Sequence, residues 1–330
     1  MYWIKLFLKQ MGPLGKTASV DHEHLKRLDG VDFRPVFVLG NHRSGTTLLY
    51  QMLAASESFN VVTAYHVIEG DRLLTNHLES RETTVKKELR EMLARRTAAD
   101  GGKRLIDEVS VSPDLPEEYG FRLSERKIRP RNLSEFITFC KKVQYIAGDT
   151  KPLLLKNPWD FPNFLFLRQA LPQARFIFIH RNPLRVMNSQ IRAVRALFSA
   201  RAPYHALVDP WYRRIAASPT LLAFARWALS PPLGILFREV MGTMRESAVY
   251  FMQNHKALEG AYIQVRYEDL CEDPSSTISR ILGFLDMEPT QPQAYAPLVR
   301  PRRLDLLPEV EKNADQIKRL LGPYLEHCGY

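Results

Sequence analysis

The sequence lacks the features that define several protein classes. Its three cysteines, Cys140, Cys271 and Cys328, form neither a C-x-x-C pair nor a zinc-binding spacing with histidine. No uncharged apolar run reaches about eighteen residues, so no transmembrane helix is expected. The segment Met1–Gln10 has neither the apolar core nor the cleavage site of a secretory signal. We therefore expect a cytoplasmic protein without a metal, in which the thiols are buried and inert.

Negative charge is also in short supply. With 46 Lys and Arg against 36 Asp and Glu, the formal net charge is +10, and the densest basic run is Arg122–Arg131. No zinc finger or ribonucleoprotein motif accompanies it, so we expect no nucleic-acid partner. Met1–Gln10 either packs on the protein or lies on a membrane surface as a short amphipathic arm, which leaves peripheral membrane contact as an alternative.

The fold class follows from the alternation of short apolar runs with helical patterns. Of the 330 residues 45% are hydrophobic, which is typical of a globular protein. The expected strands are Val36–Leu39, Phe59–Thr63, Leu153–Leu155, Arg175–His180 and Ala261–Val265. Helices are expected over Asp21–Leu28, which is polar, Thr46–Ala55 and Phe161–Leu171, and Asp273-Pro274 is expected to cap a further helix. This order predicts an α/β protein, a P-loop-like three-layer fold with a central, mostly parallel sheet flanked by helices. We expect a single domain over 1–330, with a lead-in at 1–33 and a helical insertion at 199–245 that is a substrate lid, a surface-seeking patch or plain core.

The most informative segment is the loop Gly40–Thr47, called the glycine loop below. Gly40 and Gly45 satisfy the G-x-x-x-x-G part of the Walker pattern, but Thr46 stands where that pattern requires lysine. Arg43 lies inside the loop instead. Backbone N–H groups from Ser44 to Thr47, at the start of a helix, are expected to face an anion that differs from the terminal phosphate of ATP.

A second candidate site follows the strand Arg175–His180. Asn182 is a candidate helix N-cap, with Pro183 at the first helical position. Arg181 leaves the end of the strand, and Ser189 lies two helical turns further on. Both side chains can therefore reach one phosphate at the carboxyl edge of the sheet, where such sheets bind ligands.

Taken together, the two elements resemble the cofactor signatures of sulfotransferases that use 3'-phosphoadenosine 5'-phosphosulfate (PAPS). The resemblance implies that the glycine loop binds the 5'-phosphosulfate and that Arg181 and Ser189 bind the 3'-phosphate. Arg266–Leu270 is similar to the tyrosine motif at a later strand end in that family. The cofactor-binding residues implied in this way are Arg43, Ser44, Gly45, Thr46, Thr47, Arg181, Ser189, Tyr267 and Arg302.

Within that family, the chain resembles the branch that includes tyrosylprotein and bacterial small-molecule sulfotransferases. That branch carries Arg-Ser-Gly-Thr-Thr-Leu, whereas cytosolic steroid and phenol enzymes have lysine at the position of Arg43. Asp114–Leu123 and Leu155–Pro158 also resemble segments of the bacterial branch. The similarity covers roughly residues 35–290, with the insertions unmatched.

The resemblance implies a sulfuryl transfer by in-line displacement to a hydroxyl or amine of a small-molecule, lipid or carbohydrate acceptor. Arg43 and Lys156 are expected to stabilise negative charge on the departing phosphate. Cytosolic members have a histidine two positions after the lysine that matches Lys156, but Pro158 stands there in this chain. The candidates for the general base are therefore His66, Glu69 and Glu118.

Two other functions remain alternatives at this stage: a P-loop kinase of a small molecule, and a non-catalytic anion-binding module. The missing Walker lysine counts against a kinase, and the strand Arg175–His180 is followed by Arg181 where a metal-binding acid would be needed. An anion-binding module accounts for the net charge but not for the spacing of Arg181 and Ser189. The oligomeric state is left open by the sequence.

Overall fold

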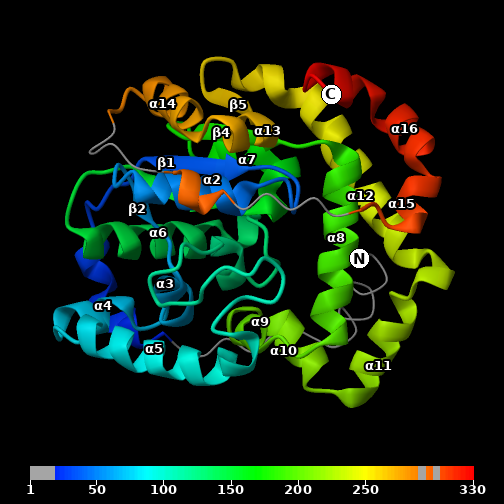
Figure 1. Cartoon of the computed structure of the whole chain (residues 1–330). Helices are drawn as coiled ribbons and strands as arrows, with labels where there is room; N and C mark the ends of the chain where they lie inside the picture. Colours follow the sequence, from blue (N-terminus) through cyan, green and yellow to red (C-terminus); the bar gives the residue numbers. More distant parts are fainter. Residues whose placement is uncertain (1–18, 289–294, 300–304) are drawn as a thin grey trace.

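A five-stranded parallel sheet forms the centre of the computed structural model, which describes residues 19–288, 295–299 and 305–330 (Figure 1). Its strands are β1 (Pro35–Leu39), β2 (Asn60–Val61), β3 (Leu153–Lys156), β4 (Arg175–His180) and β5 (Tyr262–Arg266). They are ordered β2-β3-β1-β4-β5, and every neighbouring pair is parallel. The α/β class expected from the sequence is confirmed.

The register of the strands collects the functional candidates at one edge. Val38 of β1 is paired with Lys156 of β3, and Leu39 is paired with Phe178 of β4. At the end of β4, His180 is paired with Arg266 of β5. Because parallel strands end on the same side, the segments that follow β1, β3, β4 and β5 leave the sheet at its carboxyl edge.

Helices cover both faces of the sheet, with several more at its periphery (Figure 1). Those up to the insertion are α2 (Thr46–Ala55), α3 (Ala64–Ile68), α4 (Leu73–Leu78), α5 (Glu82–Thr97), α6 (Leu133–Ala147), α7 (Phe164–Ala170) and α8 (Pro183–Ser199). The later ones are α9 (Pro203–Val208), α10 (Pro210–Ala216), α11 (Pro219–Ala228), α12 (Ile235–Asn254), α13 (Tyr267–Glu272), α14 (Pro274–Phe284), α15 (Pro308–Lys312) and α16 (Ala314–His327).

The two faces of the sheet bury separate hydrophobic clusters. On β1, Val36 and Val38 join the cluster with α2 and α14, whereas Phe37 and Leu39 join the larger cluster with α6, α7, α8 and α12. This alternation follows from the two-residue period of a strand. All five residues of β1 are buried, so a continuous apolar run is the expected sequence for this strand.

Two local expectations differ from the structure. The polar helix expected over Asp21–Leu28 is a 3₁₀-helix, η1 (Val20–Leu28), and Asp21 is fully buried. The Asp21 carboxylate accepts hydrogen bonds from the Leu74 N–H (3.1 Å) and pairs with Lys142 Nζ at 2.7 Å, so it anchors η1 to α4 and α6. The helix expected over Phe161–Leu171 starts as a 3₁₀-helix, η5 (Pro158–Asn163), which has Pro162 inside it.

The insertion at 199–245 is helical, as expected. It contains α9, α10, α11, the short 3₁₀-helix η6 (Pro231–Leu233) and the first half of α12. None of the helices in the described part of the chain is long and apolar enough to cross a membrane. Among the thiols, Cys140 and Cys328 are buried, whereas Cys271 is only half-buried.

Candidate active site

The glycine loop has a backbone that its sequence makes possible. Gly45 has φ = 104°, and a Cβ there would lie 2.3 Å from Cδ2 of Tyr267. A Cβ on Gly40 would lie 2.5 Å from the Ile179 carbonyl oxygen. Arg43 itself adopts φ = 69°, a left-handed conformation that is uncommon for a residue with a side chain. Both glycines are therefore needed for the loop to pass close to β4 and Tyr267.

The amino end of α2 offers donors to a ligand. The residue at the N-cap is Gly45, which has no side chain to accept a hydrogen bond from the first turn. The N–H groups of Thr46 and Thr47 are therefore not capped by this residue. The Ser44 N–H differs from the expectation, because it donates to the Asn41 carbonyl at 3.0 Å. The buried Ser44 Oγ has no hydrogen-bond partner among the described residues.

The two cofactor signatures, far apart in the chain, meet in the structure. Arg43 Nε donates to Ser189 Oγ at 3.1 Å, and Arg181 Nη1 donates to the Arg43 carbonyl at 3.2 Å. The Arg181 guanidinium also lies over the Tyr267 ring, 4.0 Å from its centre. Four of the predicted residues therefore converge at the carboxyl edge of the sheet: Arg43 from the glycine loop, Arg181 directly after β4, Ser189 from α8 and Tyr267 from α13.

Lys156 lies beside the glycine loop, at the end of β3. Its Nζ donates to Thr47 Oγ1 at 3.0 Å and pairs with Glu118 Oε1 at 3.0 Å. The Lys156 side chain is fully buried, so its ammonium group does not reach solvent. The pair joins the cation expected from the sequence to one of the three expected candidates for the general base.

The Glu118 carboxylate is held in its charged form. Burial favours the neutral acid, but the charge of Lys156, its hydrogen bond to the carboxylate and the charge of Arg104 outweigh burial and lower the pKa of Glu118. Glu118 is therefore ionised at neutral pH, as a proton acceptor must be.

His42 is a site residue that sequence reasoning missed. Burial lowers its pKa to about 4, because the charge of Glu118, which raises the pKa, does not offset burial and the nearby positive charges, so the imidazole is neutral at physiological pH. Its ring packs against Trp159 with 4.4 Å between ring centres, and its Nε2 has no hydrogen-bond partner within the described ranges. Its position between the two loop residues Asn41 and Arg43 was the available signal.

A buried ionic cluster lies on the neighbouring residue Glu117, and no sequence pattern predicts it. Arg104 Nη1 lies 3.0 Å from Glu117 Oε2, while its Nη2 lies 2.5 Å from Asp107 Oδ2. Tyr204 of α9 donates to Glu117 Oε2 at 2.5 Å. The segment 104–118, called the acidic segment below, is thus fixed to the insertion by a hydrogen-bonded charge network.

The other two candidates for the base lie in different surroundings. His66 Nδ1 accepts a hydrogen bond from the Thr63 N–H at 3.1 Å, which makes the ring part of the amino-terminal cap of α3. Burial lowers the pKa of His66 to about 3. Glu69 is the residue that ends α3. Arg302, the remaining cofactor candidate, lies outside the described residues.

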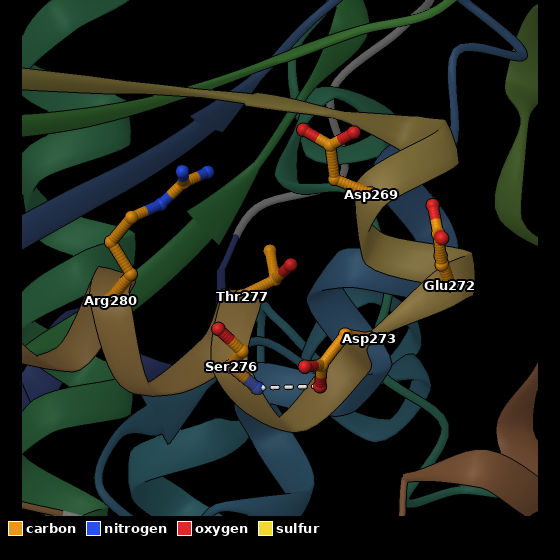
Figure 2. A pocket seen from close by; sticks show the side chains of 6 residues that line it. All are labelled: Asp269, Glu272, Asp273, Ser276, Thr277 and Arg280. Atoms are coloured by element: carbon orange, nitrogen blue, oxygen red, sulfur yellow. Dashed lines mark hydrogen bonds between the residues drawn. The ribbon is translucent and has the colours of Figure 1, made fainter.

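A hollow of about 300 Å³ lies over α13 and α14, and none of the predicted site residues lines it. Figure 2 shows that its lining comes from the two helices themselves, with Asp273 accepting the Ser276 N–H at 3.0 Å as the α14 cap. The cap expected from Asp273-Pro274 is thereby confirmed. No cluster of three or more His, Cys, Asp or Glu side chains suited to a metal occurs in the described part of the chain.

The fold and the converging residues define an α/β protein with a P-loop-like glycine loop, in which Thr46 replaces the Walker lysine and Arg43 and Arg181 lie close together. A sequence profile described as "Sulfotransferase family" matches residues 35–292. This match covers most of the chain, and the chain belongs to the sulfotransferase family of enzymes.

Curated relatives and solved structures agree with this assignment. The omega-hydroxy-beta-dihydromenaquinone-9 sulfotransferases Stf3 of Mycobacterium bovis and Mycobacterium tuberculosis are each 24% identical over 301 residues. The match covers 81% of this chain and 66% of each relative, so the chain matches just under two thirds of their length.

Two crystal structures share the fold at low sequence identity. Sulfotransferase STF9 from Mycobacterium avium has a TM-score of 0.62 at 15% identity, over 93% of this chain and 79% of that chain. Sulfotransferase STF1 from Mycobacterium tuberculosis has a TM-score of 0.54 at 14% identity, over 91% and 80%. At such identities the likeness concerns the fold alone.

Proposed function

We propose that this protein transfers a sulfuryl group from PAPS to the hydroxyl of an acceptor. The observation that carries the proposal is the meeting of Arg43, Arg181 and Ser189, which lie on two signatures 138 or more positions apart in the chain. A kinase does not need this second arginine–serine site, and an anion-binding module does not need the Lys156–Glu118 pair beside it.

Two observations on the glycine loop itself, which do not depend on the family match, fit the binding of PAPS. Close backbone approach at Gly40 and Gly45 makes a cradle that a Cβ would fill, and the buried Ser44 Oγ lacks a partner among the described residues. The first turn of α2 and Arg43 would hold the 5'-phosphosulfate. Arg181 and Ser189 would hold the 3'-phosphate, in place of their present contacts with the Arg43 carbonyl and side chain.

PAPS, when bound, supplies the sulfuryl group and departs as adenosine 3',5'-bisphosphate. The bond between sulfur and the bridging phosphate oxygen breaks while a bond from the acceptor oxygen forms, in line. Lys156, buried and 3.0 Å from the Thr47 hydroxyl, would stabilise the negative charge on the departing phosphate. Arg43 would act on the same charge from the other side of the loop.

Glu118 is our proposed general base. It would take the proton of the acceptor hydroxyl and later release it to solvent. Its lowered pKa keeps it ionised, and its contact with Lys156 places it beside the cation assigned to the leaving group. His66 is used in the cap of α3, which makes it a weaker candidate.

We further propose that residues 1–330 act as one sulfotransferase unit with a partly apolar acceptor. Tyr204 of the insertion contacts the acidic segment directly, which places α9 beside Glu118. The relatives named above act, by name, on a hydroxylated menaquinone. A hydroxyl on an apolar lipid or small molecule is therefore the acceptor class that we would test first.

The cofactor assignment is tested by thermal shift with three nucleotides. Adenosine 3',5'-bisphosphate should raise the melting temperature more than adenosine 5'-phosphosulfate does, and ATP with Mg²⁺ should have the smallest effect. Stabilisation by ATP with Mg²⁺ alone would refute the proposal and favour the kinase. Turnover of PAPS labelled with ³⁵S against a panel of hydroxylated lipids and phenols then tests the transfer itself.

A further inference from the structure

One stretch of the insertion contains no acidic residue. Between Asp209 and Glu239 the chain carries four arginines and neither aspartate nor glutamate. This stretch covers α10, α11, η6 and the start of α12. A run of this length at a local charge of +4 is unusual in a chain whose charged residues are otherwise mixed, and it indicates a surface that meets negative charge.

The basic residues here differ from those of the densest basic run. In that run, Arg122 pairs with Asp71 at 2.7 Å and Arg126 pairs with Asp209 at 2.5 Å. In the acid-free stretch, Arg226 and Arg238 donate to backbone carbonyls, which leaves their charge unneutralised. The local sequence therefore places uncompensated positive charge on α11 and α12.

Two large aromatic side chains are exposed on the same helix. Phe224 is 52% exposed and Trp227 is 60% exposed, and their ring centres lie 5.8 Å apart. The other large apolar residues exposed in the described ranges, Val20, Val249 and Leu320, lie on three different elements. Only on α11 do such side chains form a pair within the part of the chain described, and the exposed Pro231 and Pro232 follow it closely.

Helix α11 is firmly attached to the protein. Arg226 Nε donates to the Phe198 carbonyl at 2.7 Å, its Nη2 donates to the Ser199 carbonyl at 3.1 Å, and Arg195 Nε donates to the Leu229 carbonyl at 3.3 Å. Ala225 and Leu229 are buried beneath it. Figure 1 shows α11 at the far end of α8 from the sheet. The exposed pair therefore stands on a fixed platform remote from the glycine loop.

We propose that α11 and η6 dock this protein on a membrane surface that contains anionic lipids. Phe224 and Trp227 enter the boundary between headgroups and acyl chains, where aromatic side chains are favoured. The exposed Arg213 and Arg238 face the anionic headgroups, whereas Arg226 holds α11 against the end of α8. The absence of acidic residues suits this occupant, whereas a second copy of the chain would bring an identical positive surface into contact with it.

Vesicle binding by the full chain tests the proposal without any nucleotide, so its failure is distinguishable from failure of the proposed function. The measurement is co-sedimentation with vesicles of phosphatidylcholine alone and of phosphatidylcholine mixed with phosphatidylglycerol. We expect strong binding to the mixed vesicles and a blue shift of tryptophan fluorescence, which Trp227→Phe reduces. Equal binding to both vesicles, or none to either, overturns the proposal.

Substitutions locate the surface. The double variant Phe224→Ser/Trp227→Ser should weaken binding about tenfold or more, and Arg213→Ala about fivefold. The matched control is Val249→Ser, on an exposed residue of α12, which should leave binding unchanged. A loss with Phe7→Ser but not with the double variant would assign the membrane contact to the N-terminal segment and refute α11 as the docking surface. Circular dichroism and the thermal unfolding midpoint verify that each variant folds.

Self-association is the competing occupant of this surface. Sedimentation equilibrium of the wild-type protein without lipid should show no dimer that depends on Phe224 and Trp227. A dimer that the double variant disperses would overturn the proposal and assign the exposed pair to contact between copies.

Discussion

The glycine loop is held by backbone geometry, whereas the acidic segment beside it is held by buried charges. Gly40 and Gly45 fit the loop against β4 and Tyr267 with no room for a Cβ. The acidic segment instead depends on Arg104, which neutralises Glu117 and Asp107. The region to which we assign the cofactor therefore follows from local sequence, whereas the region to which we assign the acceptor depends on contacts between distant residues.

The largest effect should come from the acceptor side, with Glu118→Gln. Removing the proposed base while keeping its shape should lower kcat by about a thousandfold and leave nucleotide binding unchanged. Single-turnover kinetics with PAPS and saturating acceptor measure the loss. Glu69→Gln is the matched control and should retain turnover, and full activity of Glu118→Gln would dismiss Glu118 as the base.

The next largest effect is expected for Arg104→Met, on the stability of the protein. It leaves Glu117 and Asp107 as buried charges without their partner, which should cost about 3 kcal/mol or more in the free energy of unfolding. Urea denaturation followed by circular dichroism provides the value. Arg90→Met, which breaks the exposed pair with Asp114, is the comparison and should change stability by about 0.5 kcal/mol or less. Equal losses would show that the acidic segment is not held by its buried charges.

On the cofactor side, Arg181→Ala should weaken binding of adenosine 3',5'-bisphosphate by about thirtyfold, since it removes a charge-assisted contact to phosphate. Binding of adenosine 5'-phosphosulfate, which has no 3'-phosphate, should change much less. Isothermal titration measures both. Arg175→Ala, on the same strand but at its other end, controls for the lost charge. Equal losses of affinity for the two nucleotides would show that Arg181 does not bind the 3'-phosphate.

The smallest effect expected in catalysis concerns His66. His66→Ala removes an acceptor in the cap of α3 and should cost about 1 kcal/mol of stability. With acceptor at saturation, kcat should stay within twofold of the wild-type value, by a rough estimate for a residue outside the chemistry. A large loss of kcat in folded protein would favour His66 over Glu118 as the general base.

The pH dependence of stability tests the buried environment of His42 in the glycine loop. Since the pKa of His42 is lowered from 6.5 to about 4, the unfolded chain binds this proton at a higher pH than the folded protein does. The free energy of unfolding should therefore fall as the pH drops from 6.5 towards 4. His42→Gln should reduce this slope, and denaturant titrations at several pH values measure it. An unchanged slope would show that His42 titrates alike in both states.

The sequence was sufficient where the determinants are local. The strand Arg175–His180, the helix Thr46–Ala55 and the Asn182 cap occur as expected, because apolar runs, glycines and N-cap residues act on their immediate neighbours. Asp21 shows the limit of such reasoning. It was assigned to a polar helix, but its burial depends on Lys142, more than a hundred residues away.

The same limit applies to the site. Arg181 and Ser189 were found because a helical spacing connects them, and the structure places both beside Arg43. The contact of Glu118 with Lys156, the enclosure of His42 and the link from Glu117 to Tyr204 join segments that no local pattern relates. Pairings of this kind depend on tertiary packing, which periodicity does not encode.

Helix α8 connects the region of the glycine loop with α11, because it contacts Arg43 through Ser189 and Arg226 through Phe198. Ser189 lies in its middle, and the Phe198 carbonyl near its carboxyl end holds Arg226 of α11. Nine residues of helix separate the two, a rise of about 14 Å. If the protein docks through α11 as proposed, about this distance along α8 separates the proposed nucleotide site from the lipid-facing helix, and an acceptor anchored in the bilayer has to extend its hydroxyl to reach that site.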